Sequence, residues 1–204
     1  MTAGALAVRA VLFDLDGVLV DSYDAWFEVV NAAARRFGEP PVSRERLAEV
    51  FGQGPEEDAR TLYPGRAVSE IQAAYEEAMA GAVSALVVGS DAHAALDDLA
   101  RRGILRAVVT NTQVDVARHI LRAAGLLDRL DTWVGVGGGL CEKPAPDLVL
   151  RALERLDLAP EEALFVGDTW YDEEAARAAG VPFLHFELRS GGALGRALAP
   201  RLVD

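Results

Sequence analysis

The stretch RAVLFDLD, residues 9–16, is a short apolar run that ends in two carboxylates. Such a run is typical of a buried parallel strand with polar chemistry at its C-terminal end. Similar runs recur as ILRAVVTN (104–111), TWVGV (132–136), ALFVGD (163–168) and PFLHF (182–186), and helical patterns separate them. Alternation of this kind predicts right-handed βαβ units, and therefore a doubly wound parallel sheet with helices on its faces.

One long segment interrupts this alternation. From Ser22 to about Leu86 the sequence shows helical periodicity, with Gly and Pro as breaks, and no convincing strand. We therefore expect an α/β protein of two domains: a Rossmann-like core of residues 1–21 and 87–204, and an inserted α-helical cap of residues 22–86. The length of 204 residues is sufficient for one well-buried domain that carries a smaller insert.

The composition argues against several kinds of partner. A formal net charge of −12 speaks against a nucleic acid or an anionic membrane, because binding to phosphate groups over a wide area needs a basic face. The single cysteine, Cys141, cannot form an internal disulfide or a cysteine metal cage. Nothing in the sequence resembles a signal peptide or a membrane-length apolar run, so we expect a cytoplasmic protein.

Polar residues collect at the ends of the predicted strands. In open α/β sheets, ligands bind beyond the carboxyl ends of the strands. The residues at those ends are, in chain order, Asp14, Asp16 and Gly17; Thr110 and Asn111; Lys143; and Asp168, with Asp172 one turn later. Three acids, a hydroxyl and one ammonium at a single edge suit phosphoryl transfer with Mg²⁺, a cation that prefers hard oxygen ligands.

The spacing of Asp14 and Asp16 indicates how such a site would work. Residues i and i+2 of an extended strand point the same way, so both carboxylates can face the cleft, one as nucleophile and the other passing protons. Gly17 then lets the backbone turn without a Cβ atom. Asp14 and Asp168 are the carboxylates expected to bind the metal.

Lys143 is the only lysine among the 20 Lys and Arg residues of the chain. An ammonium is a compact point charge that can neutralise both a phosphate oxygen and a nucleophilic carboxylate, where the planar fork of Arg would fit differently. We therefore place Lys143 in the predicted site.

Four segments together resemble a known family. They are FDLDGVLVDS (13–22), VVTN (108–111), EKPAPD (142–147) and FVGDTWYDEEAARAAG (165–180). In this order, and with an insert after the first, they resemble the haloacid dehalogenase-like hydrolase superfamily, subfamily I, in its phosphoglycolate-phosphatase-like branch. The resemblance covers most of the chain, and four ordered motifs are far more specific than the pair of aspartates alone.

The resemblance implies a role for each site residue. Asp14 would attack the phosphorus and form an aspartyl-phosphate, with Asp16 as acid and base. The other implied roles are phosphoryl binding by Thr110 and the Asn111 amide, pairing of Lys143 with nucleophile and phosphate, Mg²⁺ ligation by Asp14, Asp168 and the Asp16 carbonyl, and support of these ligands by Asp172. A covalent intermediate divides one difficult displacement into two easier ones.

The residues of the predicted cap and of the first motif argue against some activities of the family. It contains no lysine, which speaks against the Schiff-base chemistry of the family's phosphonate-cleaving members, and Asp16 speaks against carbon–halogen chemistry. The stretch FGQGPEED (51–58) resembles the loop that the family's caps present to the active site, so Gln53 is a candidate for contact with the leaving group. Four cap arginines are candidates for binding a carboxylate or second phosphate, with a solvated face as the alternative: Arg44, Arg46, Arg60 and Arg66.

The function that follows is Mg²⁺-dependent hydrolysis of a small phosphorylated metabolite, with no protein partner implied. One alternative is phosphoryl transfer to another hydroxyl, as in a sugar-phosphate mutase. A second is a binding or regulatory role on a fold without catalysis, against which the intact acids and Lys143 speak.

Overall fold

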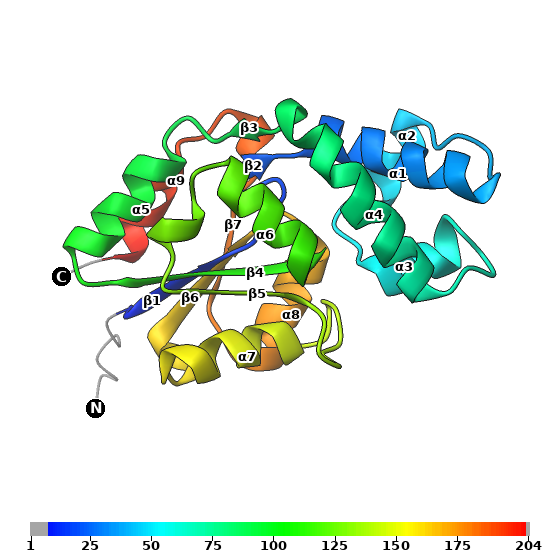
Figure 1. Cartoon of the computed structure of the whole chain (residues 1–204). Coiled ribbons are helices and arrows are strands. Elements are labelled where there is room, and N and C mark those ends of the chain that lie inside the picture. Colours follow the sequence, from blue (N-terminus) through cyan, green and yellow to red (C-terminus); the bar gives the residue numbers. More distant parts are fainter. Residues whose placement is uncertain (1–7, 203–204) are drawn as a thin grey trace.

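A five-stranded sheet forms the centre of the computed structural model, which describes residues 8–202 (Figure 1). Its order is β5-β4-β1-β6-β7, and all neighbouring strands run parallel. The strands are β1 (Ala10–Phe13), β4 (Leu105–Gln113), β5 (Thr132–Val136), β6 (Ala163–Gly167) and β7 (Phe183–His185). All five lie where the sequence predicts strands, and the order is that of a doubly wound sheet.

Helices cover both faces of this sheet, which explains why β1 is apolar at every position. Val11 and Phe13 pack into the hydrophobic cluster on one face, and Ala10 and Leu12 into the cluster on the other. The first face is covered by α5 (Ala92–Arg101), α6 (Val114–Ala123) and α9 (Leu194–Leu198), and the second by α7 (Asp147–Leu156) and α8 (Trp170–Ala179). Successive strand residues point to opposite faces, so a strand buried on both sides shows an unbroken apolar run.

Four further helices lie between Asp21 and Val87, as the sequence predicts: α1 (Tyr23–Phe37), α2 (Arg44–Val50), α3 (Pro55–Thr61) and α4 (Val68–Ala82). Local signals set their ends, because Gly38 ends α1 in a left-handed conformation with φ of 72° and the Ser43 hydroxyl accepts a hydrogen bond from Arg46 N at the start of α2. Apolar residues of the helices join the hydrophobic cluster on the first face of the sheet, and the Tyr63 hydroxyl donates to the Val30 carbonyl at 2.7 Å. We call these four helices the cap.

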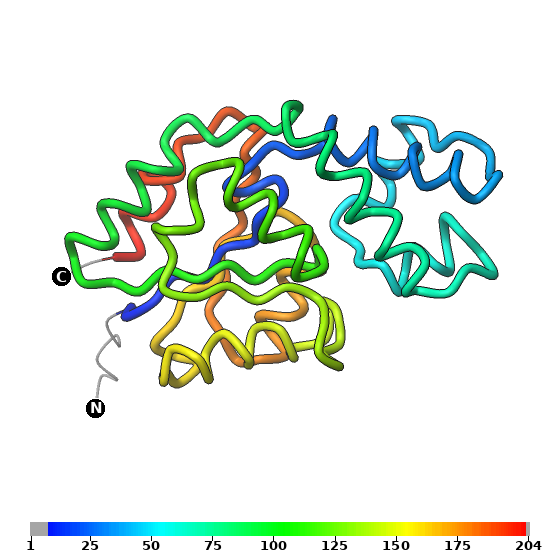
Figure 2. Tube along the Cα trace, in the orientation of Figure 1, coloured from blue at the N-terminus to red at the C-terminus, as the bar shows by residue number. Residues whose placement is uncertain are grey.

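Two short strands that the sequence does not predict connect the cap to the sheet. β2 (Val20–Asp21) and β3 (Val87–Val88) pair antiparallel, so the chain enters and leaves the cap side by side (Figure 2). The predicted limits of the cap, residues 22 and 86, lie next to this pair, and the division into two domains stays a prediction.

Short 3-10 turns complete the described chain, at Val83–Ala85, Leu127–Arg129, Pro160–Glu162, Leu188–Ser190 and Ala199–Arg201. In the range 8–202, no helix is both long enough and apolar enough to span a bilayer.

Candidate active site

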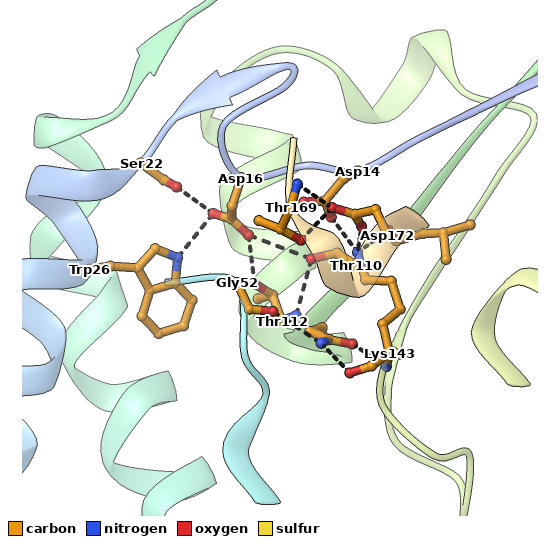
Figure 3. A network of polar contacts seen from close by, with 12 residues as sticks. Asp14, Asp16, Ser22, Trp26, Gly52, Thr110, Thr112, Lys143, Thr169 and Asp172 are labelled. Carbon is orange, nitrogen blue, oxygen red and sulfur yellow. Dashed lines mark hydrogen bonds and ion pairs between the residues drawn. The ribbon is translucent and has the colours of Figure 1, made fainter. Parts of the chain in front are cut away.

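Lys143 is buried among the carboxyl ends of the strands, where it contacts two carboxylates (Figure 3). Its Nζ lies 2.9 Å from Oδ1 of Asp14 and also donates to Oδ1 of Asp172 and to the Val109 carbonyl. The side chain is only 2% exposed. Residues from three separate segments therefore meet at one point, as the sequence analysis expects.

The charges at this point strongly influence one another. Burial alone would lower the pKa of Lys143, but Asp14 and Asp172 raise it above its ordinary value, so the ammonium stays charged. Burial raises the pKa of Asp14 well above its ordinary value; Lys143 opposes this rise, and the other site aspartates add to it. One ammonium is thus outnumbered by carboxylates, and a further cation would stabilise the ionised form of Asp14.

Asp172 is held from two sides. Its Oδ2 accepts hydrogen bonds from the backbone N and the hydroxyl of Thr169, at 3.0 and 2.6 Å, and caps the first turn of α8, while Oδ1 faces Lys143. Gly167 permits this close approach, because a Cβ at that position would lie 2.3 Å from the Cβ of Asp172. Both carboxylate oxygens are engaged, so Asp172 is suited to orienting Lys143.

The acidic residues fit a divalent metal ion. Asp14, Asp168 and Asp172 each offer a carboxylate oxygen, and these oxygens lie within 4.8 Å of one another. Oδ1 of Asp168 is buried without a hydrogen-bond partner among the described residues, and burial raises the pKa of Asp168 to about 7, with Asp172 adding to the rise. A set of carboxylate oxygens suits a hard cation such as Mg²⁺. The free oxygen makes Asp168, together with Asp14, the better pair of ligands.

Gly17 is required for the close approach of Asp168 as well as for the turn after β1. It adopts a φ of 87°, and a Cβ there would lie 2.1 Å from Oδ2 of Asp168. A side chain at this position would therefore strain the backbone and displace the carboxylate.

Asp16 has a different set of partners from Asp14. Its Oδ1 accepts hydrogen bonds from the Ser22 hydroxyl and, at 2.9 Å, from the indole Nε1 of Trp26. Its Oδ2 accepts from the hydroxyls of Thr112 at 2.7 Å and Thr110 at 3.5 Å. Asp16 is thus held between β4 and the first helix of the cap (Figure 3).

Ser22, Trp26 and Thr112 are site residues that the sequence analysis missed. β4 continues two residues past its predicted end, with an irregular register against β5 between Val109 and Gln113. Because residues two apart share a side of a strand, this continuation brings Thr112 to the carboxylate that Thr110 also reaches. Ser22 ends the first quoted motif, and Trp26 follows it by about one helical turn.

Asn111 acts through its side chain. Oδ1 accepts from Lys143 N at 2.6 Å, and Nδ2 donates to the Lys143 carbonyl and to the Gly52 carbonyl of the cap, both at 3.0 Å. The amide therefore fixes the backbone that carries Lys143 and ties it to the cap. The predicted phosphoryl contact of Asn111 through its backbone N–H stays a prediction.

A second contact between core and cap lies beside Lys143. The Glu142 carboxylate accepts hydrogen bonds from Glu56 N at 3.2 Å and Glu57 N at 3.0 Å, at the start of α3. The approach depends on Gly54, since a Cβ there would lie 2.0 Å from Oε2 of Glu142. The cap is therefore closed onto the strand ends.

A small cavity of about 50 Å³ lies between cap and core and includes Asp14, Asp16, Thr110 and Asn111 in its lining. Gln53 lines it as well, but its Nε2 donates to the carboxylate of Asp58 and to the Thr61 hydroxyl. The part of Gln53 in substrate binding stays a prediction. Asp58, which ends the FGQGPEED stretch, also lines the cavity, and so do Tyr75 and Gln113, for which the sequence indicates no part in the site.

Comparison with known proteins identifies the family. The chain matches the haloacid dehalogenase-like hydrolases over residues 11–186. A phosphoglycolate phosphatase of Xylella fastidiosa is 35% identical over 181 residues, which are 85% of this chain and 78% of that protein. The crystal structure of a HAD-superfamily hydrolase of subfamily IA from Geobacter sulfurreducens is 30% identical, covers 87% of this chain and 88% of its own, and has a TM-score of 0.66.

A third protein shares the fold at lower identity. CbbY of Rhodobacter sphaeroides, solved in complex with xylulose-1,5-bisphosphate, is 24% identical, with a TM-score of 0.79 over 88% of this chain and 86% of its own. The matched residues 11–186 include all four quoted motifs, and the structure gathers residues from each motif around Lys143 and Asp16. The chain therefore belongs to the haloacid dehalogenase-like hydrolases, in their phosphoglycolate-phosphatase-like branch, and is a phosphoric monoester hydrolase.

Proposed function

We propose that the protein hydrolyses a small phosphomonoester in a Mg²⁺-dependent reaction, through an aspartyl-phosphate on Asp14. The observation that carries the proposal is the 2.9 Å contact between Lys143 Nζ and Oδ1 of Asp14, next to the buried free oxygen of Asp168. The ammonium beside the nucleophile can balance the charge of an anionic substrate. The acid without a partner can bind a metal ion.

The first half of the reaction uses both aspartates after β1. A carboxylate oxygen of Asp14 attacks the phosphorus, and the bond from phosphorus to the leaving oxygen breaks. Asp16, in its protonated form, gives its proton to that oxygen, so that the leaving group departs as an alcohol. The hydrogen bonds from Thr112 and Trp26 fix the orientation of the Asp16 carboxyl.

The second half regenerates the enzyme. Asp16, now a carboxylate, takes a proton from a water molecule whose oxygen forms a bond to phosphorus. The bond between phosphorus and Asp14 breaks, which releases inorganic phosphate and restores both residues. Lys143 remains beside Asp14 throughout and balances its charge.

Asp14 and Asp168 would hold the Mg²⁺ ion, together with the Asp16 carbonyl. Bound there, the ion would offset the repulsion between the carboxylate and the phosphate. Asp172 would help to orient Asp14 through its contact with Lys143. Gly17 would leave room for the Asp168 carboxylate, because it has no side chain.

Phosphoglycolate, in the name of one relative, and xylulose-1,5-bisphosphate, bound in the complex of CbbY, are small phosphorylated metabolites. A closed cap over a small cavity suits a substrate of this size, because closure excludes bulk water from the aspartyl-phosphate.

The test measures phosphate release from a panel of small phosphomonoesters with and without Mg²⁺, for the wild type and for Asp14→Asn. We expect Mg²⁺-dependent release that Asp14→Asn loses by at least about 10³-fold, since removal of a nucleophile costs at least this much. Retained turnover in Asp14→Asn would refute the nucleophile, and phosphoryl transfer to a second hydroxyl without phosphate release would indicate a mutase.

Metal binding has its own readout. Mg²⁺ at 100 times its Kd should stabilise the wild type against unfolding by about 2.7 kcal/mol. Asp168→Asn should remove most of this gain, as measured by thermal unfolding with Mg²⁺ and with a chelator. An equal gain in both proteins would show that the ion binds elsewhere.

A further inference from the structure

The cavity under the cap has an uneven distribution of charge. The core side is lined by Asp14, Asp16 and residues 110–113, and the cap side mostly by apolar side chains. Among the described residues, no arginine or lysine belongs to this lining. The polar atoms that the cap adds come from four side chains: Trp26, Gln53, Asp58 and Tyr75.

Asp58 is the charged group of the cap that reaches the cavity. Its side chain is buried, its Oδ1 accepts from Gln53 Nε2, and its Oδ2 accepts from the Tyr75 hydroxyl at 2.7 Å. A carboxylate can accept about four hydrogen bonds, so acceptor positions remain free. Burial raises the pKa of Asp58 to about 7, although the bonds from Gln53 and Tyr75 oppose the rise.

Gln113, at the end of β4, adds a second acceptor. Its Nε2 donates to the Gln72 carbonyl of α4 at 2.8 Å, which fixes the orientation of the amide. Its Oε1 is buried and has no hydrogen-bond partner in the range 8–202. A buried carbonyl oxygen without a partner is unfavourable, and a donor on a bound molecule would satisfy it.

The four candidate arginines of the cap have partners outside the cavity. Arg44 pairs with an aspartate of α1, and Arg46 and Arg60 pair with glutamates of their own helices. Arg66 donates to the Phe37 carbonyl at 2.6 Å. None of them lines the cavity, so the solvated-face alternative fits these four better than recognition of an anion.

We propose that the cap selects a leaving group that carries no negative charge and presents hydrogen-bond donors, with Asp58 and Gln113 as the acceptors. This inference rests on the proposed phosphatase function and adds the substrate class. A carboxylate on the leaving group would meet the Asp58 carboxylate without any cation in the lining, whereas hydroxyl or ammonium groups would pair with both acceptors. We therefore expect this chain to prefer a leaving group without a carboxylate, unlike a phosphatase that acts on phosphoglycolate.

Three phosphomonoesters of the same size test the proposal: 2-hydroxyethyl phosphate, 2-aminoethyl phosphate and phosphoglycolate. Their dissociation constants are measured by calorimetry at pH 8 with Mg²⁺ on Asp14→Asn, which binds without turnover. We expect phosphoglycolate to bind at least about tenfold more weakly than the better of the other two, as sites built around hydrogen bonds discriminate strongly. The order of those two identifies the donor as hydroxyl or ammonium, and tighter binding of phosphoglycolate overturns the proposal.

Asp58→Asn, in the same Asp14→Asn background, tests the residue. It keeps the size of the side chain and one acceptor oxygen but removes the charge. The preference against phosphoglycolate should shrink at least about fivefold, because the repulsion is gone. Glu56→Gln is the matched control, since it removes a charge from the same helix at an exposed side chain and should leave the preference unchanged. An unchanged preference in Asp58→Asn overturns the assignment.

This design separates the inference from the function on which it rests. Binding to Asp14→Asn reports the preference, and phosphate release by the wild type reports the phosphatase. Preference without release in the wild type would refute the proposed function alone. Release from phosphoglycolate with the highest kcat/KM of the three would refute the inference alone.

Discussion

The indole Nε1 of Trp26, in the first cap helix, donates a hydrogen bond to Oδ1 of Asp16 at 2.9 Å. This bond joins the cap to the residue that would transfer the proton in the proposed reaction. Ser22 donates to the same oxygen and Thr112 to the other, so Asp16 is oriented partly by the core and partly by the closed cap. Closure of the cap would therefore help to position Asp16 for this proton transfer.

Replacement of Trp26 by Phe should lower kcat by about tenfold. The change keeps an aromatic ring in the cap and removes a donor that orients the buried Asp16 carboxyl, and loss of the partner of a buried polar group costs about 1–3 kcal/mol. Ser22 and Thr112 remain, so activity is reduced and not abolished. Steady-state kinetics measure the change. Trp133→Phe, at the start of β5, is the matched control and should leave kcat unaltered; a kcat of Trp26→Phe within twofold of wild type would contradict the prediction.

Replacement of Lys143 by Met should destabilise the fold as well as abolish turnover. The ammonium is 2% exposed and lies between Asp14 and Asp172, and removal of one partner of a buried ion pair costs about 3–5 kcal/mol. Urea unfolding at pH 8 with a chelator measures the loss.

The companion variant carries Asp172→Asn in addition to Lys143→Met. It removes one of the two carboxylates left without a cation, so part of the lost stability should return. A double variant no more stable than Lys143→Met would show that the loss comes from packing and not from charge.

The sheet and most of the site follow from the sequence because short-range patterns determine them. The buried run of β1 and the four similar runs predict the strands, and the parallel sheet then brings Asp14, Lys143 and Asp168 to one edge. Pairing β2 with β3 escapes prediction, because two residues on each side are too few to form a pattern.

The cap side of the site depends on tertiary contacts that no local pattern reports. The stretch FGQGPEED places Asp58 near a loop that faces the site, but Asp58 itself follows two glutamates at the start of a helix, as in a solvent-exposed first turn. Only the packing of α3 against α4 buries it beside Tyr75. Likewise, the sequence indicates only a core aromatic at Trp26, and its hydrogen bond to Asp16 follows from the position of α1 in the folded protein.

Asp58 should make the stability of the protein depend on pH. Burial raises its pKa from 3.8 to about 7, and nearby Glu142 and Glu57 add to the rise. The folded state therefore keeps this proton between about pH 4 and pH 7, where the unfolded state has lost it, so this group lowers the free energy of unfolding as pH rises through that window. Asp58→Asn lacks the effect, and its stability relative to wild type should rise by up to about 4 kcal/mol between pH 4 and pH 8.

Urea unfolding across this pH range measures the difference. Asp24→Asn is an instructive control, because a hydrogen bond from Arg44 lowers the pKa of Asp24. That stabilisation is present above the ordinary pKa of an aspartate and is lost as pH falls, so the sign is opposite. A difference between Asp58→Asn and wild type that does not change with pH would show that Asp58 is ionised in the folded protein over the whole range.

Gly54→Ala should loosen the closed cap without straining its own backbone. Gly54 has φ of −100° and ψ of 178°, which alanine adopts readily, but the added Cβ would lie 2.0 Å from Oε2 of Glu142. Glu142 must then leave the N–H groups of Glu56 and Glu57, and we expect KM to rise by about three- to tenfold, since those bonds are made in the closed form.

Gly81→Ala is the matched control for this effect. Gly81 lies in α4 with open space around its Cα, so alanine there should stabilise the protein by about 0.5–1 kcal/mol and leave KM unchanged. Glu142→Ala should raise KM as Gly54→Ala does, and Gly54→Ala should add little to it, because both remove the same contact. Independent, additive effects of the two changes on KM would show that Gly54 acts on the cap by another route than Glu142.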